Sequence, residues 1–235
     1  MRRTTAAALD LGQAEGGFLA PPCETVAVAP QPLSAADREL LRRYFRKIAP
    51  LTDDECAEVD AAVATRRFER GQPFLEAGAP AVDCGAVLRG VMREYYPLAD
   101  GGEATRGFSG PGDGIGSLSD LLSDQPARSS IVAEVDTCAA VVSWAHLREV
   151  AARVPAWARY LARVTEQLYV TKATREYELL ALDAEQRYAR FRSRYASIEA
   201  AVALRHVASY VGVTPEHLSR LRRRLGVARS APGGG

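Results

Sequence analysis

Residues 205–225 of this chain have the sequence RHVASYVGVTPEHLSRLRRRL, which predicts two short helices joined by a tight turn. Gly212 can adopt the positive φ that such a turn requires, and Thr214 followed by Pro215 is a typical helix start. At about 100° per residue, three leucines share one narrow face of the second helix and can pack against valines of the first: Leu218, Leu221 and Leu225. This is the pattern of a helix-turn-helix unit.

The opposite face of the second helix is polar and mostly basic. Glu216, Arg220 and Arg223 fall on it at helical spacing. Residues 187–229 contain ten arginines, no lysine and two acidic residues, so this segment carries about +8 while the whole chain carries +1. An uneven charge distribution of this kind is typical of a protein with one module that meets phosphates, so DNA is the predicted partner. The alternative is a generic amphipathic helical hairpin with a solvated charged face.

The composition excludes several other classes of protein. A chain of 235 residues is long enough for two modest domains. It contains no run of 18 apolar residues, so we expect no membrane-spanning helix and no membrane partner, and we expect a cytoplasmic protein. The four cysteines stand singly and form no C-x2-C pair, which argues against a zinc ribbon or an iron–sulfur cluster: Cys23, Cys56, Cys84 and Cys138.

The first two thirds of the chain divide into an extension, two helices and a β-rich region. Residues 1–32 are rich in Ala, Gly and Pro and predict a flexible extension. A sensor domain is then expected over residues 33–154, beginning with a helix capped by Ser34 and a second helix opened by a capping box at Thr52. Short β-branched and aromatic segments predict a jelly-roll-like barrel or β-roll from strands at 66–69, 82–89, 91–98, 103–108, 131–135 and 139–143.

Residues 155–182 predict one long helix, followed by a hinge at Asp183 and a helix-turn-helix domain over residues 183–228. Four side chains of the helix follow the spacing of a coiled-coil seam: Trp157, Leu161, Val164 and Leu168. A seam without an obvious partner in the chain predicts a homodimer, whereas packing against the chain's own β-domain is the alternative, and both can hold at different positions. Residues 229–235 predict a flexible tail.

This order of elements, with two specific motifs, resembles the catabolite activator/FNR (CRP/FNR) family of bacterial transcription regulators. The motifs are GDGIGSL at residues 112–118, followed by Arg128-Ser129, and VGVTPEHLSR at residues 211–220. The resemblance implies an α+β fold: a cyclic nucleotide-binding-like β-roll, a long dimerisation helix and a C-terminal helix-turn-helix. Family members usually continue into a β-hairpin wing, but residues 226–235 predict no strand, so we expect no wing here.

In the family the first motif binds the phosphate of a cyclic nucleotide, so the resemblance implies a nucleotide effector. The implied effector-binding positions are Gly116, Ser117, Leu118, Arg128, Ser129, Thr171 and Thr174. Ser117 departs from the family pattern, because it stands where a glutamate accepts the ribose hydroxyl. We therefore expect a degenerate nucleotide site, and a different effector, or none, is the alternative.

The second motif implies how DNA is recognised. The implied DNA-binding residues are Thr214, Glu216, His217, Ser219, Arg220, Arg222, Arg223 and Arg224. Glu216 matches a position that accepts from cytosine N4, and Arg220 matches one that donates to guanine. Pro215 replaces a third base-contacting arginine, so the half-site should differ from the family's. The arginines at 222–224 are better assigned to phosphates, which contribute salt-dependent affinity without sequence information.

Two other functions are alternatives to DNA binding. A cupin-type metalloenzyme needs histidines inside the barrel, but the three histidines lie outside the predicted strands, with His146 expected at the end of the last one. We therefore expect no enzyme and no metal site. The stronger alternative is a cyclic-nucleotide-sensing interaction module without a specific DNA site, which the arginine-rich helix disfavours. As a CRP/FNR-type regulator the chain would have double-stranded DNA with an inverted repeat as its partner, and RNA polymerase as a further one.

Overall fold

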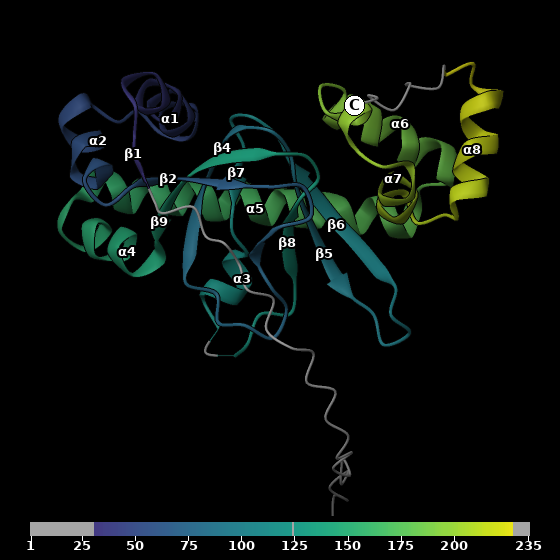
Figure 1. Cartoon of the computed structure of the whole chain (residues 1–235), viewed down its shortest axis with the longest axis horizontal. Coiled ribbons are helices and arrows are strands. Elements are labelled where there is room, and N and C mark those ends of the chain that lie inside the picture. Colours follow the sequence, from purple (N-terminus) through teal and green to yellow (C-terminus); the bar gives the residue numbers. More distant parts are fainter. Residues whose placement is uncertain (1–30, 124, 228–235) are drawn as a thin grey trace, which may run out of the picture.

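The β-rich region forms two antiparallel sheets packed face to face (Figure 1). The structure is a computed structural model, and it describes residues 31–123 and 125–227. The first sheet has the strand order β1-β2-β9-β4-β7, with β1 Gln31–Pro32, β2 Ala64–Phe68, β9 Thr137–Ser143, β4 Asp83–Arg89 and β7 Gly114–Ile115. The second has the order β3-β8-β5-β6, with β3 Pro73–Leu75, β8 Ser130–Ala133, β5 Met92–Pro97 and β6 Glu103–Ser109.

The predicted β-roll is therefore confirmed, and each of the six predicted strands has a counterpart. Alternating side chains of both sheets meet in a buried core that includes Phe68, Val87, Met92 and Ile131. The sequence did not predict β1, β3 and β7, which are two or three residues long and too short for a period-2 pattern. Strand β1 pairs with β2, so ordered structure begins before the expected boundary at residue 33, and the rest of the expected extension lies outside the described residues.

Helices cover one end of the roll: α1 Ala35–Ile48, α2 Asp53–Asp60, α4 Trp144–Arg153 and the start of α5. Their apolar sides form one core, in which Phe45 meets Trp157 edge to face with ring centroids 4.9 Å apart. The predicted caps are present, since Ser34 accepts from the backbone of Asp37 and Thr52 forms a capping box. Helix α4 was not predicted, and it places His146 on a helix rather than at the end of the last strand.

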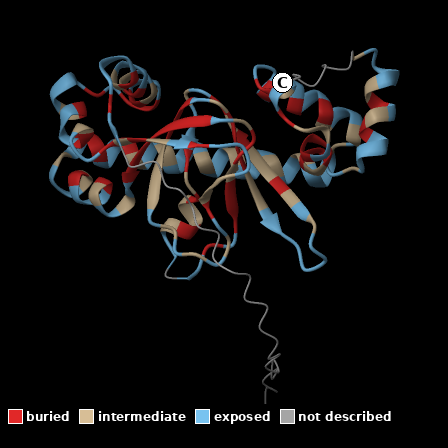
Figure 2. Cartoon of the chain, viewed as in Figure 1, coloured by how far each residue is buried: buried red, intermediate tan, exposed pale blue. Residues whose placement is uncertain are grey.

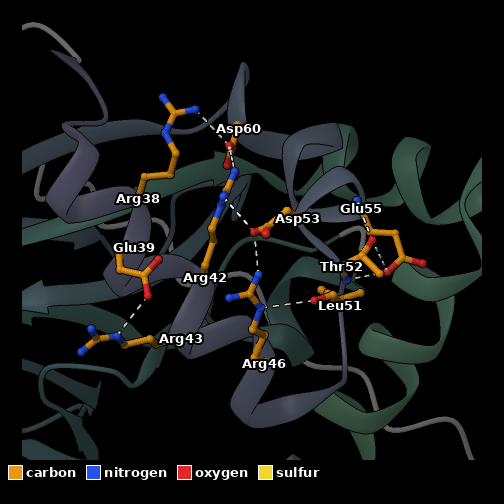
Figure 3. A network of polar contacts seen from close by, with 10 residues as sticks. All are labelled: Arg38, Glu39, Arg42, Arg43, Arg46, Leu51, Thr52, Asp53, Glu55 and Asp60. Atoms are coloured by element: carbon orange, nitrogen blue, oxygen red, sulfur yellow. Dashed lines mark hydrogen bonds and ion pairs between the residues drawn. The ribbon is translucent and has the colours of Figure 1, made fainter.

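Ion pairs fix α1 against α2 on the outside of this end (Figure 3). Arg42 contacts Asp53 at 2.9 Å and Asp60 at 3.2 Å, while Arg38 and Arg46 each contact one of the same two carboxylates. Asp60 is nearly buried, with 8% of its side chain exposed. The network therefore holds the two helices in one arrangement, against which the first turns of α5 pack.

Helix α5 spans Pro155–Ala181, as predicted, and runs along the β-roll to the C-terminal domain (Figure 1). The predicted seam faces its own chain: Trp157 is fully buried, and Leu161 and Val164 pack on the same core. The alternative of packing against the chain's own domain thus holds for this face. Another stripe of α5, defined here as its outer face, is exposed in the single chain: Tyr169, Val170, Ala173, Tyr177 and Leu180.

The C-terminal domain consists of α6 Ala184–Tyr195, a 3₁₀ turn at Glu199–Ala201, α7 Leu204–Val211 and α8 Pro215–Arg224. Asp183 caps α6 in a capping box with Gln186, which confirms the helix start predicted there. Leu218 and Leu221 are buried as predicted, but Leu225 is 42% exposed because α8 ends before it. No strand follows α8 among the described residues, which end at Val227.

The C-terminal domain is packed onto strand β6 of the β-roll, mainly through α7. The backbone N–H of Thr105 donates to Oγ of Ser209 at 2.9 Å, and this hydroxyl donates to the carbonyl of Glu103 at 2.8 Å. Phe108 of the roll joins an aromatic cluster with Tyr195 and Tyr210. The two domains therefore share a hydrophobic core, although the sequence predicted them as separate units.

A buried ion-pair network lies beside this core. Nδ1 of His206, on α7, is 2.7 Å from Oε1 of Glu134, and Arg93 donates to the same carboxylate at 2.6 Å. Arg93 also pairs with Glu103 at 2.8 Å. Only 4% of the side chains of Arg93 and Glu134 is exposed. Each charge of the network is thus compensated by a neighbour. Three of the residues belong to the β-roll, and His206 belongs to the C-terminal domain.

Candidate DNA-binding helix and effector cavity

The turn between α7 and α8 has the geometry that the sequence predicted. Gly212 has φ +77°, and its N–H donates to the carbonyl of Ala208 at 2.9 Å, which ends α7. Thr214 then accepts from the backbone N–H of His217 at 3.2 Å and starts α8, with Pro215 at the first helical position. Buried leucines fix the rotation of α8, so its opposite side is presented outward.

Most of α8 is exposed, and the helix lies at the end of the molecule farthest from α1 and α2 (Figures 1 and 2). Glu216, Arg220 and Arg223 are exposed along one side, and Ser219 lies between them, half-buried. Hydrogen bonds to its own backbone N–H and to Thr214, together with the charge of Arg220, lower the pKa of Glu216 below its usual value. The carboxylate is therefore an acceptor at neutral pH, which contact with a cytosine amino group requires.

The three consecutive arginines differ in their surroundings. Arg223 is exposed on the outward side, whereas Nη2 of Arg224 lies 3.4 Å from Glu185 of α6. Arg222 is half-buried on the side of α8 that faces Tyr188. Of the three, Arg223 has the position best suited to contact DNA beside Glu216 and Arg220. Phosphate contacts by Arg222 and Arg224 remain predictions.

A cavity of about 680 Å³ lies between the β-roll and α5. Gly116 and Leu118 line it, with Arg128 and Thr171, as the sequence predicted for an effector site. Gly116 has φ +128°, and a Cβ there would come within 3.1 Å of Cys84, so the loop needs a glycine. Ser117, Ser129 and Thr174 do not line the cavity, so it does not bring all the predicted residues together.

The positions expected to bind phosphate are already engaged by carboxylates of the chain. Ser129 is fully buried, and its Oγ lies 3.0 Å from Oδ2 of Asp120 and 3.0 Å from Oε1 of Glu94. The Arg128 side chain is 71% exposed and pairs with Asp120 at 3.4 Å. Ser117 is buried and lies 3.5 Å from Nη1 of Arg106.

A cyclic phosphate placed here would lie beside two carboxylates, Glu94 and Asp120. Burial raises the pKa of Asp120, but hydrogen bonds from Ser117, Ser129 and Arg128 lower it overall, so the carboxyl is ionised at neutral pH. Glu94 and Arg106, which pair with each other, were not found from the sequence. They lie on neighbouring strands twelve residues apart, and no local motif marks such a pair.

Comparison with known proteins agrees with this architecture. Residues 65–154 match the family of cyclic nucleotide-binding domains. None of the curated protein sequences matches the chain. Among solved structures, FixK2 from Bradyrhizobium japonicum has 22% sequence identity and a TM-score of 0.61, over 70% of this chain and 84% of that one.

Two further structures are similar to nearly the same extent. The c-di-GMP-responsive global regulator CLP of Xanthomonas campestris has 18% identity and a TM-score of 0.60, over 74% of this chain and 92% of that one. A Eubacterium rectale protein assigned as a transcriptional regulator of the Crp/Fnr family has 17% identity and a TM-score of 0.60, over 75% of this chain and 84% of that one. The chain thus has the fold of the CRP/FNR regulators, as the order of its elements predicted. No helix among the described residues is long and apolar enough to cross a membrane.

Proposed function

We propose that the chain is a dimeric, sequence-specific DNA-binding transcription regulator of the CRP/FNR type that acts in the cytoplasm. The observation that carries this proposal is the outward side of α8, where Glu216, Arg220 and Arg223 lie exposed at one end of the molecule. A helix presented in this way fits the major groove, where a carboxylate can accept from cytosine and a guanidinium can donate to guanine. The regulator has no catalytic role in this proposal.

The outer face of α5 supports dimerisation. Tyr169 is 73% exposed and Leu180 is 80% exposed, while the opposite side of the same helix packs on its own β-roll. Tyr169, Ala173, Tyr177 and Leu180 recur at spacings of three and four residues, which allows two copies of α5 to pair along their length. A two-fold dimer would bring two α8 helices to successive major grooves, about 34 Å apart, over an inverted repeat.

Contacts between the domains support control of DNA binding by the β-roll. The Arg175 guanidinium, on α5, lies over the ring of Tyr210 on α7 at 3.9 Å and also donates to the carbonyl of Tyr210. Both residues line the effector cavity. A ligand that displaces Arg175 would therefore act directly on the first helix of the helix-turn-helix. RNA polymerase is the further partner that an activating role would require.

Competition experiments test this function. A gel shift on a bound genomic fragment, with rising amounts of non-specific competitor DNA, should leave a specific complex of the parent protein. Arg220→Ala should reduce the preference for this fragment by about 1–3 kcal/mol. Arg223→Ala serves as the matched control, because loss of a phosphate contact should weaken all sequences alike and reduce the salt dependence. If the competitor removes the parent protein completely, an interaction module without a specific DNA site explains the chain better.

A further inference from the structure

The effector cavity changes in character along α5. Near the start of the helix its lining is apolar, with Tyr160, Leu161 and Val164, and farther along it is polar, with Thr171 and Lys172. At 1.5 Å per residue, the lining positions from residue 160 to residue 175 extend over about 22 Å. The cavity is therefore elongated, and its polarity changes from one end to the other.

The apolar end lies under the helices that cover the β-roll. Leu41, Phe45 and Ile48 of α1 line it opposite the first turns of α5, and all three belong to the buried core. Space lined by aliphatic and aromatic side chains favours a hydrocarbon group over water. This end contributes affinity for an apolar body but contains little that could bind a sugar or a phosphate.

The charged residues of the lining are mostly basic. Six basic and two acidic residues line the whole cavity: Lys47, Arg106, Arg128, Lys172, Arg175 and Arg194, with Glu94 and Asp113. Arg106 is paired with Glu94, whereas Lys172 makes no hydrogen bond or ion pair within the part of the chain that the structure describes. Burial and then the charges of Arg106 and Arg128 lower the pKa of Lys172, and the charges of Glu94 and Asp120 offset this only in part. An anion beside Lys172 would relieve this repulsion.

Contacts of Ser129 decide against a nucleotide as the source of this anion. Its hydroxyl is shared by Glu94 and Asp120, so a phosphate at the family position would meet two carboxylates. Lys172 makes no hydrogen bond to this group, although the charges of Glu94 and Asp120 reach it, so its ammonium can pair with a carboxylate while the contacts of Ser129 stay intact. Lys172, which is exposed and makes no ion pair among the described residues, and the apolar end together favour an anionic head on an elongated apolar body.

We propose that the cavity binds a linear amphipathic carboxylate, of the fatty-acid class, with its head group at Lys172 and its hydrocarbon chain directed along α5 toward Phe45. A cavity of this volume is in the usual range for a small-molecule site. The head group would lie one helical turn from Arg175, which contacts α7. The proposal adds a ligand class to the sensor role proposed above, and it rests on that role only for its effect on DNA binding.

Titration of the DNA-free, full-length protein with sodium dodecanoate, kept below its micelle-forming concentration, tests the proposal. Trp144 lines the cavity, so tryptophan fluorescence can report binding beside calorimetry. We expect saturable binding of one dodecanoate per chain. Hexanoate should bind more weakly, by roughly fourfold for each methylene that is no longer buried. Cyclic AMP and cyclic di-GMP should neither bind more tightly nor displace the dodecanoate.

Two charge variants identify the head-group position. Lys172→Met keeps the length of the side chain and removes its charge, and it should weaken dodecanoate binding at least about tenfold. Arg163→Met is the matched control, because Arg163 is exposed on the same helix and does not line the cavity. The affinity of this variant for dodecanoate should equal that of the parent protein. Thermal melting of both variants shows whether they remain folded.

Three results of the fatty-acid titrations would overturn the proposal, and a fourth comes from the competition with nucleotides. The first three are the absence of saturable dodecanoate binding, equal affinity of Lys172→Met and the parent, and tighter binding of dodecanol than of dodecanoate. Displacement of dodecanoate by a cyclic nucleotide would assign the cavity to nucleotides instead. Since DNA is absent from the titration, failure here leaves the proposed DNA binding untouched, and failure of the gel shift leaves the ligand assignment untouched.

Discussion

Gly212 shows how a single residue fixes the helix-turn-helix. Its φ of +77° lies in the left-handed region, and a Cβ added there would find its nearest neighbour 3.8 Å away, at Arg187. Space is therefore available, and only backbone strain opposes another residue. Gly212→Ala should lower the free energy of unfolding by about 1 kcal/mol or more.

Urea denaturation checks this value, and Gly212→Asn is the matched variant, because asparagine tolerates the left-handed region better than alanine. The asparagine variant should lose less stability than the alanine variant. Equal losses would mean that the side chain, and not the backbone conformation, causes the destabilisation.

Residues with a local role were predictable from the sequence, because capping and turn formation depend on neighbours in the chain. Thr52, Asp183, Thr214 and Gly212 have the predicted roles. The carboxylates that contact Ser129 come from β5 and from the short helix α3 (Leu118–Leu121), and no spacing in the sequence brings them together. The expected phosphate contacts of Ser129 and Arg128 were predicted from position alone, without the neighbours that now engage them.

At the scale of elements, the contact between α7 and the β-roll depends on Glu134. Burial raises the pKa of Glu134, but the hydrogen bond and charge of His206 and of Arg93 lower it overall. A lowered pKa means that ionised Glu134 stabilises the folded state above its unfolded pKa of about 4.3. This contribution is lost as the pH falls through the folded pKa.

Glu134→Gln should therefore cost about 3 kcal/mol at pH 7, because Arg93 loses one buried partner. The difference in melting temperature between parent and variant should shrink as the pH falls below about 5. Calorimetric scans of both proteins from pH 7 to pH 3 measure this difference in melting temperature. A difference that stays constant with pH would show that the charge of Glu134 does not stabilise the contact.

Helix α5 was predicted with nearly the observed length, and of the two alternatives for its seam, the first part packs on the chain's own core. Its apolar residues occur on two sides, and periodicity alone does not say which side the β-roll covers.

Leu180→Glu, on the outer face, should convert the dimer to a monomer without unfolding it, because a charge would be buried in the interface. Analytical ultracentrifugation measures the mass, with Glu176→Lys as a charge change at an exposed neighbouring position. A parent protein that is itself monomeric would contradict the pairing of α5.

At the scale of the whole molecule, the order of elements was predictable and the contact between the domains was not. The β-roll, the long helix and the helix-turn-helix each have a periodic pattern or a motif of their own. The shared core of Phe108 with Tyr195 and Tyr210 joins residues about ninety to a hundred positions apart, which no local pattern reveals. This contact joins the β-roll to α6 and α7 of the C-terminal domain.

Selection of bound duplexes from a random pool by the purified parent protein tests the proposed function most directly. We expect an inverted repeat with half-site centres one helical turn apart, and a G·C pair in each half-site that Arg220→Ala no longer selects. Enrichment of no sequence, or the same sequence selected by the parent and by Arg220→Ala, would contradict recognition of DNA through α8.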